Sequence, residues 1–217
     1  MTVRKKTAIF ISGRGSNMRS LIEAARDTEF PASIELVLAN NITAPGIAAA
    51  RDAGVKSAGI VGSSFPDRLS FDKVLDESLR SAAIEIVCLA GYMQFLTPWF
   101  VGRWLGRLIN IHPSLLPAYK GLHTHRRALE DGVRIHGCTT HFVTPELDSG
   151  PIIMQAAIDV GVSENETSLA ARVLEQEHLI YPRTLALVAS GAARLKEGRC
   201  VLEGHSSAGS ALVSPTI

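Results

Sequence analysis

The chain has 217 residues, 46% of them hydrophobic and 20% charged, which is enough to bury the core of one α/β domain. Its formal net charge of +1 provides no broad basic field, which argues against a nucleic-acid-binding protein. The three cysteines, Cys88, Cys138 and Cys200, are far apart and lack C-x-x-C spacing, which argues against a disulfide framework or a zinc knuckle and favours a reducing compartment.

The N-terminus begins like a signal peptide, with Arg4-Lys5-Lys6 ahead of an apolar run. That run is too short for a signal peptide and ends in a glycine turn at 12–15. No apolar run approaches the ~20 residues that span a bilayer. We therefore expect a cytoplasmic protein with neither a membrane nor a nucleic acid as partner.

The first half of the chain alternates short apolar runs with amphipathic segments. The runs predict strands at 7–12, 34–39, 57–61 and 84–90. The intervening segments predict helices that start near 16 and cover 45–53 and 66–82. This order predicts an α/β fold, a Rossmann-like doubly wound sheet with a parallel N-terminal half.

The pattern changes after Pro98. Strands are predicted at 108–111, 135–144 and 152–158, and the short connection between the last two favours an antiparallel pair in the C-terminal half. A long helix is predicted at 166–189, which Pro182 should break or kink. Residues 1–203 are predicted to form a single domain, and the Gly-, Ser- and Ala-rich residues 204–217 a disordered tail.

Asn110 and His112 stand at the end of the strand that Pro113 terminates. Because residues two apart in a strand point to the same side, their side chains project together. An amide beside an imidazole can hold a carbonyl oxygen and stabilise the negative charge that it gains when attacked. The pair therefore indicates a site at which a carbonyl group is attacked.

The turn Gly13-Arg14-Gly15-Ser16-Asn17 links the first strand to a helix, where backbone amides favour an anion such as phosphate. A dinucleotide site would require a third glycine, where Met18 stands, and an acidic residue in place of Asn40. A monophosphate fits better, and a tight turn without any ligand is the alternative.

A metal site is the alternative use of the histidines. His123 and His125 could supply two ligands, with Asp148 or His141 as the third. No H-E-x-x-H motif or cysteine set supports this alternative. We therefore expect no metal.

Asp148 lies in a glycine-proline turn, where an aspartate commonly caps backbone amides. Its functional interpretation is a carboxylate close to His112 that orients the imidazole and favours its charged form. A covalent nucleophile is poorly supported, because Ser16 lies outside a G-x-S-x-G elbow and Cys88 lies inside an apolar strand. Direct attack by a substrate amine is more natural.

Five motifs in order carry a resemblance: GRGSN at 13–17, LAGYM at 89–93, NIHPSLLP at 110–117, GLHTH at 121–125 and ELDSGP at 146–151. From about residue 7 to 190, the chain closely resembles the phosphoribosylglycinamide formyltransferase family. The NIHPSLLP element alone marks a wider group of folate-dependent formyltransferases and hydrolases.

The resemblance implies that the amino group of glycinamide ribonucleotide attacks the formyl group of 10-formyltetrahydrofolate, the co-substrate, in de novo purine synthesis. A tetrahedral intermediate forms, and tetrahydrofolate leaves. Asn110 and His112 would bind the developing oxyanion, and Asp148 would hold His112 and assist proton transfer.

The same resemblance implies two binding regions. The residues that would bind the ribonucleotide are Gly15, Ser16, Asn17, Leu174, Glu175, Gln176 and Glu177. The residues that would bind the folate are Arg68, Met93, Gln94, Phe95, Leu96, Asn110, Thr144, Pro145, Glu146, Leu147 and Asp148. Without the resemblance, Arg68 and Glu177 would be interpreted as solvent-exposed charged residues on helices. Met93, Phe95 and Leu96 would be interpreted as residues of the hydrophobic core.

Two residues depart from the family's pattern: Gln94 stands where some members carry Arg, and Pro145 where some carry Asp. Both departures bear on folate affinity and leave the three catalytic candidates unchanged. We expect small-molecule substrates and a monomer or homodimer.

Three other functions compete. A formyltetrahydrofolate hydrolase would use water as acceptor, but usually has an N-terminal regulatory domain, for which a first strand near Thr7 leaves no room. A methionyl-tRNA formyltransferase would need a C-terminal RNA-binding domain. A phosphate-sensing module would not require Asn110, His112 and Asp148 together.

Overall fold

The computed structural model describes residues 4–204 and residue 214. Its strands form a seven-stranded sheet and a separate two-stranded hairpin. The strands are β1 (Lys5–Ile11), β2 (Ala32–Ala39), β3 (Lys56–Gly59), β4 (Ile86–Leu89), β5 (Leu108–His112), β6 (Ile135–Phe142), β7 (Ile152–Asp159), β8 (Ala193–Lys196) and β9 (Arg199–Leu202). The helices are α1 (Ser16–Ala24), α2 (Pro45–Asp52), the short η1 (Gly62–Ser64), α3 (Arg68–Ser81), α4 (Pro98–Arg103), α5 (Thr124–Glu130) and α6 (Glu166–Ser190).

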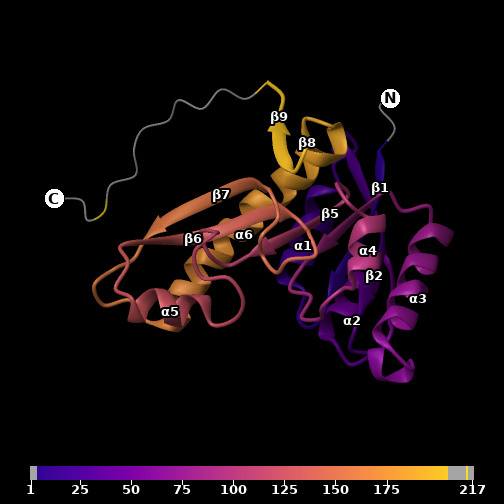
Figure 1. The fold of residues 1–217 in the computed structure, drawn as a ribbon, viewed down its shortest axis with the longest axis horizontal. Coiled ribbons are helices and arrows are strands. Elements are labelled where there is room, and N and C mark those ends of the chain that lie inside the picture. Colours follow the sequence, from indigo (N-terminus) through magenta and orange to yellow (C-terminus); the bar gives the residue numbers. More distant parts are fainter. Residues whose placement is uncertain (1–3, 205–213, 215–217) are drawn as a thin grey trace.

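The large sheet has the strand order β3-β2-β1-β4-β5-β6-β7. Neighbours from β3 to β5 are parallel, whereas β6 and β7 run antiparallel to their neighbours. The predicted fold class, a Rossmann-like sheet with a parallel first half and antiparallel later strands, is therefore confirmed. Figure 1 shows the two parts side by side, with β6, β7 and α5 extending away from the parallel half.

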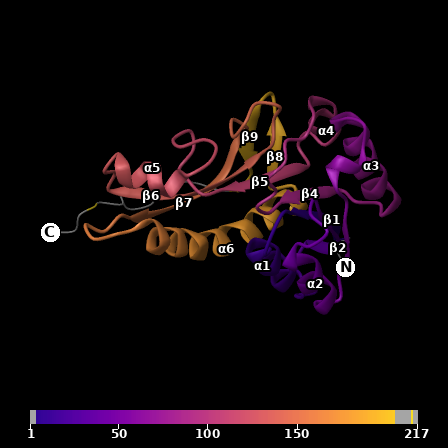
Figure 2. The ribbon, with the colours of Figure 1, turned by 90° about the horizontal axis from the view of Figure 1, so that it is seen from below.

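Two apolar cores hold helices on opposite faces of the parallel strands, as Figure 2 shows. Met18 and Leu21 of α1 join buried residues of α2 and α6 in one core. Phe71 of α3 and Phe100 of α4 lie in the other. Because both faces are covered, the central strands are apolar throughout, and all four residues of β4 are buried.

The carboxyl ends of β1, β4 and β5 meet at one edge of the sheet, next to the point where the strand order reverses between β1 and β4. Open α/β sheets bind ligands at such an edge. A hydrogen bond ties two of the loops there, since the amide of Met93 donates to Ser12 Oγ at 2.7 Å. The glycine turn, the 92–97 segment and Asn110 therefore share one edge.

The expected break at Pro182 is wrong, because α6 runs uninterrupted from Glu166 to Ser190. Pro182 removes one backbone donor, but Tyr181, Thr184 and Leu185 beside it are fully buried. Packing on both sides of the proline therefore maintains the helix. The structure also contains elements that the sequence did not predict, namely α4, α5 and the β8–β9 hairpin.

Nearly all of the predicted disordered tail, 204–217, lies outside the described residues. Among residues 4–204, no helix is both long and apolar enough to cross a membrane.

Gly150 offers a test of how tightly the β6–β7 connection is packed. A Cβ at this position would lie 1.7 Å from the carbonyl oxygen of Phe142, so Gly150→Ala must displace backbone. We expect a loss of roughly 1–3 kcal/mol in the free energy of unfolding, measured by urea titration. Gly102→Ala in α4 is the control, because its Cβ meets nothing within 4 Å. Equal stabilities for the two variants would contradict the packing described.

Candidate active site

Asn110 lies opposite His141 in the antiparallel register of β5 and β6. The Asn110 Nδ2 amide lies 3.2 Å from His141 Nε2, while His141 Nδ1 lies 2.9 Å from the carbonyl oxygen of Phe142. A carbonyl can only accept, so Nδ1 carries the hydrogen and Nε2 accepts from Asn110. Burial lowers the pKa of His141 and so favours this neutral form. Asn110 retains a second N–H for a ligand.

The ring of His112, two residues further along β5, is likewise oriented by a hydrogen bond to a backbone carbonyl. Its Nε2–H donates to the carbonyl oxygen of Tyr119 at 2.9 Å, which leaves Nδ1 as the other ring nitrogen. That Nδ1 lies 3.4 Å from Asp148 Oδ2, and both side chains are more than nine-tenths buried. The imidazole therefore has one nitrogen committed to the backbone and one facing a carboxylate.

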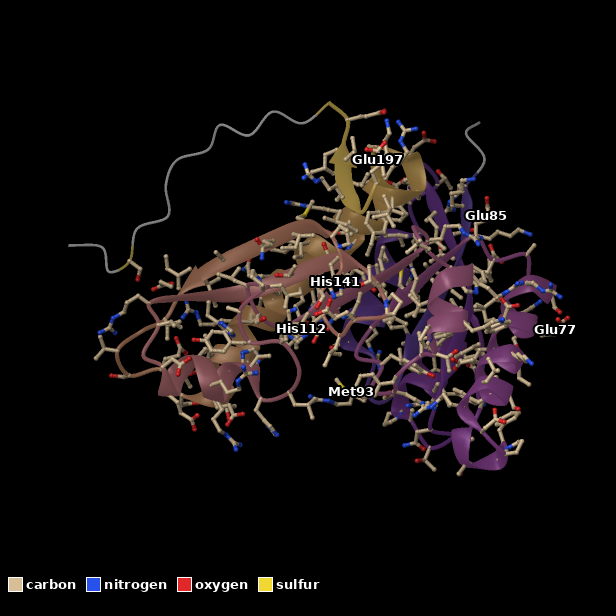
Figure 3. All side chains as sticks on the ribbon, in the orientation of Figure 1. Glu77, Glu85, Met93, His112, His141 and Glu197 are labelled. Atoms are coloured by element: carbon tan, nitrogen blue, oxygen red, sulfur yellow. The ribbon has the colours of Figure 1, made fainter. Side chains whose placement is uncertain are left out.

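Asp148 completes the cluster from the loop between β6 and β7. Its backbone adopts a left-handed conformation with φ of 46°. Its Oδ2 accepts from the Gly121 amide at 2.9 Å, and its Oδ1 lies 3.9 Å from His141 Nε2. The three side chains that the sequence singled out thus meet at one place, and Figure 3 shows His112 and His141 close together near the centre of the molecule.

The glycine turn ends in Gly15, whose left-handed φ of 70° starts helix α1 at Ser16. No side chain caps this helix. The amides of its first turn can therefore bind an anion, and the helix dipole favours negative charge there. Asn17 is buried at the same place, and its Oδ1 has no hydrogen-bond partner among the described residues.

Glu177 reaches this turn from the middle of α6. Its Oε2 accepts from Asn17 Nδ2 at 2.6 Å, and the side chain is buried. Burial raises the pKa of the Glu177 carboxyl to about 7, which the Asn17 hydrogen bond partly opposes. The reading of Glu177 as a solvated helix charge is therefore wrong. Its predicted neighbours differ, because Glu175 is exposed while Leu174 and Gln176 are half-buried.

A cavity of about 120 Å³ opens beside Asn110 and Asp148. Among its lining residues are most of the predicted folate set: Gln94, Phe95, Leu96, Asn110, Thr144, Pro145, Glu146, Leu147 and Asp148. Gln94 also lines an adjoining cavity of about 400 Å³ that contains Arg68. The two cavities therefore meet at Gln94, and Arg68 belongs to the outer one.

Arg68 and Met93 do not line the inner cavity. Arg68 donates from Nη1 to the carbonyl oxygen of Phe95 at 2.9 Å, so it holds the 92–97 segment from α3. Met93 is 70% exposed and Phe95 69% exposed, which makes their alternative assignment to the core wrong. Figure 3 places Met93 below His112 in that view.

The alternative metal set is not assembled. His123 is exposed at the start of α5, and His125 lies 3.2 Å from His136 instead of approaching Asp148. Among residues 4–204, no three His, Cys, Asp or Glu side chains are arranged to hold an ion. Cys88 is fully buried in β4, and burial raises the pKa of its thiol, which makes it a poor nucleophile.

Comparison with known proteins agrees with this arrangement. Residues 5–185 match the model of the family described as formyl transferase. The chain belongs to the formyl transferase family. Phosphoribosylglycinamide formyltransferase of Escherichia coli is 42% identical to this formyltransferase over 197 residues, covering 91% of this chain and 93% of the relative. Glycinamide ribonucleotide transformylase 1 from Symbiobacterium toebii superposes with a TM-score of 0.89 at 38% identity, covering 92% and 94% of the two chains.

A neighbour of different activity shares the fold. Formyltetrahydrofolate deformylase from Burkholderia mallei superposes on this formyltransferase with a TM-score of 0.83 at 28% identity. The superposition covers 93% of this chain and 70% of that protein. The fold is therefore common to transferases and deformylases, and the acceptor must be argued from the site.

The raised pKa of Glu177 predicts a pH-dependent cost to stability. Between the ordinary value of 4.5 and about 7, the folded protein retains a proton that the unfolded chain releases, so stability falls as pH rises through this window. Glu177→Gln removes the cost, and we expect the variant to gain up to about 3 kcal/mol over wild type at pH 8. At pH 4.5 the gain should vanish. Urea unfolding at both pH values measures it, and a pH-independent difference would contradict the assignment.

Proposed function

We propose that Asn110, His112 and Asp148 carry out the formyl transfer of this enzyme. The chain transfers the formyl group of 10-formyltetrahydrofolate, its co-substrate, to the amino group of glycinamide ribonucleotide in de novo purine synthesis. The observation that supports these residues is the 3.4 Å approach of His112 Nδ1 to Asp148 Oδ2, beside an Asn110 amide with one N–H to spare.

The reaction requires charge to be stabilised and a proton to be moved. The ribonucleotide nitrogen attacks the formyl carbon, forms the new C–N bond and places negative charge on the formyl oxygen. Collapse of the tetrahedral intermediate breaks the bond to the folate N10. The attacking nitrogen loses a proton, N10 gains one, and tetrahydrofolate leaves.

Each of the three side chains takes part in this scheme. The free N–H of Asn110 and a proton on His112 Nδ1 donate to the formyl oxygen as its charge develops. Such a preorganised donor is worth about 3 kcal/mol in the transition state. Asp148 stabilises the charged imidazole and accepts the proton that the attacking nitrogen loses, directly or through water.

The ribonucleotide is assigned to the glycine turn. Its phosphate binds the amides of Gly15, Ser16 and Asn17 at the start of α1. Glu177 binds a hydroxyl or amine further along the molecule, with Leu174, Glu175 and Gln176 beside it on α6. Asn17 joins the two regions, because its side chain is hydrogen-bonded to Glu177.

The folate is assigned to the cavity lined by residues 94–96 and 144–148. Apolar Phe95, Leu96 and Leu147 there suit a flat pterin ring, and the formyl group then lies next to Asn110. The tail of the folate leads past Gln94 toward Arg68 in the outer cavity. Gln94 and Pro145 line the inner cavity, so they act on folate affinity.

The remaining assignments concern the whole protein. We propose that residues 1–203 work as one domain, that the enzyme is a cytoplasmic monomer or homodimer, and that it takes only small-molecule substrates. All three cysteines are free, as a reducing compartment requires.

The acceptor is tested by incubating the protein with 10-formyltetrahydrofolate, with and without glycinamide ribonucleotide. We expect release of tetrahydrofolate only when the ribonucleotide is present. Release at the same rate in its absence would establish a deformylase that uses water.

The catalytic assignments predict two kinetic defects. His112→Ala should lower kcat by about 10²- to 10³-fold, because one donor to the oxyanion is lost. Its dissociation constant for the ribonucleotide, measured by calorimetry, should stay near that of wild type, since His112 does not touch the glycine turn.

Asp148→Asn should also slow turnover strongly while the protein stays folded. Wild-type turnover in either variant would remove that residue from the mechanism.

A further inference from the structure

We propose that Arg127, an exposed residue of α5, is a positioning residue for both His112 and Asp148. It acts through the neighbouring segment 119–122, which we call the clamp segment. The inference rests on the proposed function, because the effect of Arg127 is expected in formyl transfer.

The clamp segment is the one part of the described chain that contacts both catalytic side chains through its backbone. The carbonyl oxygen of Tyr119 accepts from His112 Nε2, and the amide of Gly121 donates to Asp148 Oδ2, both at 2.9 Å. Between them, Lys120 Nζ donates to Ser149 Oγ at 2.6 Å, next to Asp148. A shift of this segment would therefore move both members of the pair.

The backbone around the clamp segment is in an unfavourable conformation. Tyr119 has φ of 55° and His123 φ of 57°, both left-handed, and Gly121 lies between them at 78°. Left-handed conformations of residues other than glycine cost free energy and persist only where surrounding contacts enforce them. Something outside the segment must therefore hold it.

Arg127 supplies that hold. Its Nη1 donates to the carbonyl oxygen of Lys120 at 2.7 Å and approaches that of Leu122 at 3.5 Å. Its guanidinium carbon also lies over the Tyr119 ring, 5.4 Å from the centroid. One planar group thus contacts Tyr119, Lys120 and Leu122, which a lysine ammonium cannot reproduce.

Arg127 makes these contacts from an exposed position, so its replacement leaves both apolar cores intact. Exposed polar contacts contribute little to global stability. A small displacement of catalytic groups, by contrast, can cost up to about 100-fold in rate. We therefore expect the loss of Arg127 to appear in kcat and hardly at all in the unfolding midpoint.

The neighbouring Arg126 provides a matched control. It is an exposed arginine on the same helix, but its guanidinium contacts Glu166 of α6 at 3.2 Å instead of the clamp segment. Arg126→Ala therefore removes the same side chain from the same helix without freeing the segment.

The experiment compares Arg127→Ala, Arg127→Lys and Arg126→Ala in ribonucleotide-dependent formyl transfer. We expect Arg127→Ala to lower kcat about 10-fold or more, with KM for each substrate changed less than about 2-fold. Arg127→Lys should fall between this variant and wild type, and Arg126→Ala should match wild type. Wild-type kcat in Arg127→Ala, or an equal loss in Arg126→Ala, would overturn the proposal.

A double-mutant cycle tests the route through the clamp segment. In an Asp148→Asn background, measured by single turnover, Arg127→Ala should cost clearly less than it does in wild type, because the carboxylate is already gone and only the His112 contact remains to be disturbed. The full loss repeated in that background would overturn the route. Wild-type protein that transfers no formyl group to the ribonucleotide would instead count against the proposed function, which keeps the two failures distinct.

Discussion

The hydrogen bond from His112 Nε2–H to the Tyr119 carbonyl oxygen, 2.9 Å long, is the contact on which the rest of the site depends. A backbone carbonyl only accepts, so it fixes which ring nitrogen carries the hydrogen. The other nitrogen, Nδ1, is thereby left to face Asp148 at 3.4 Å. Rotating the ring would break the backbone bond and remove the working nitrogen from the carboxylate. The orientation of the imidazole is therefore built into the loop before any substrate binds.

Asn110 is oriented by a similar device. The carbonyl oxygen of Phe142 accepts from His141 Nδ1, so Nε2 of the same ring accepts from the Asn110 amide. Two backbone carbonyls thus determine two tautomers. Asn110 keeps one N–H available at the cavity, and His112 keeps Nδ1 available beside Asp148. Preorganised donors of this kind are effective because they need little rearrangement when charge develops. Glu177 differs from these residues, because its burial keeps a carboxyl group out of water and so costs stability when the group is ionised.

The sequence predicted the parts of this design that depend on local pattern. Strand alternation placed Asn110 and His112 on one side, and apolar runs separated by helical segments predicted the doubly wound sheet. The partner His141 was missed except as a metal ligand, because it meets Asn110 through the β5–β6 register, which spans distant residues. The break expected at Pro182 was wrong for the same reason, since α6 is one helix through the proline and other elements pack against it. The positioning role of the clamp segment could not be predicted from the sequence, because its contacts with His112 and Asp148 are made by backbone atoms.

The protonation of His112 is the most direct test of this account. Nitrogen-15 NMR of histidine-labelled protein distinguishes a ring nitrogen that bears hydrogen from one that does not, and a His112→Gln variant assigns the signals. The account predicts that Nε2 of His112 bears a hydrogen, because it donates to the Tyr119 carbonyl oxygen. A spectrum in which Nδ1 bears the hydrogen and Nε2 does not would contradict the account.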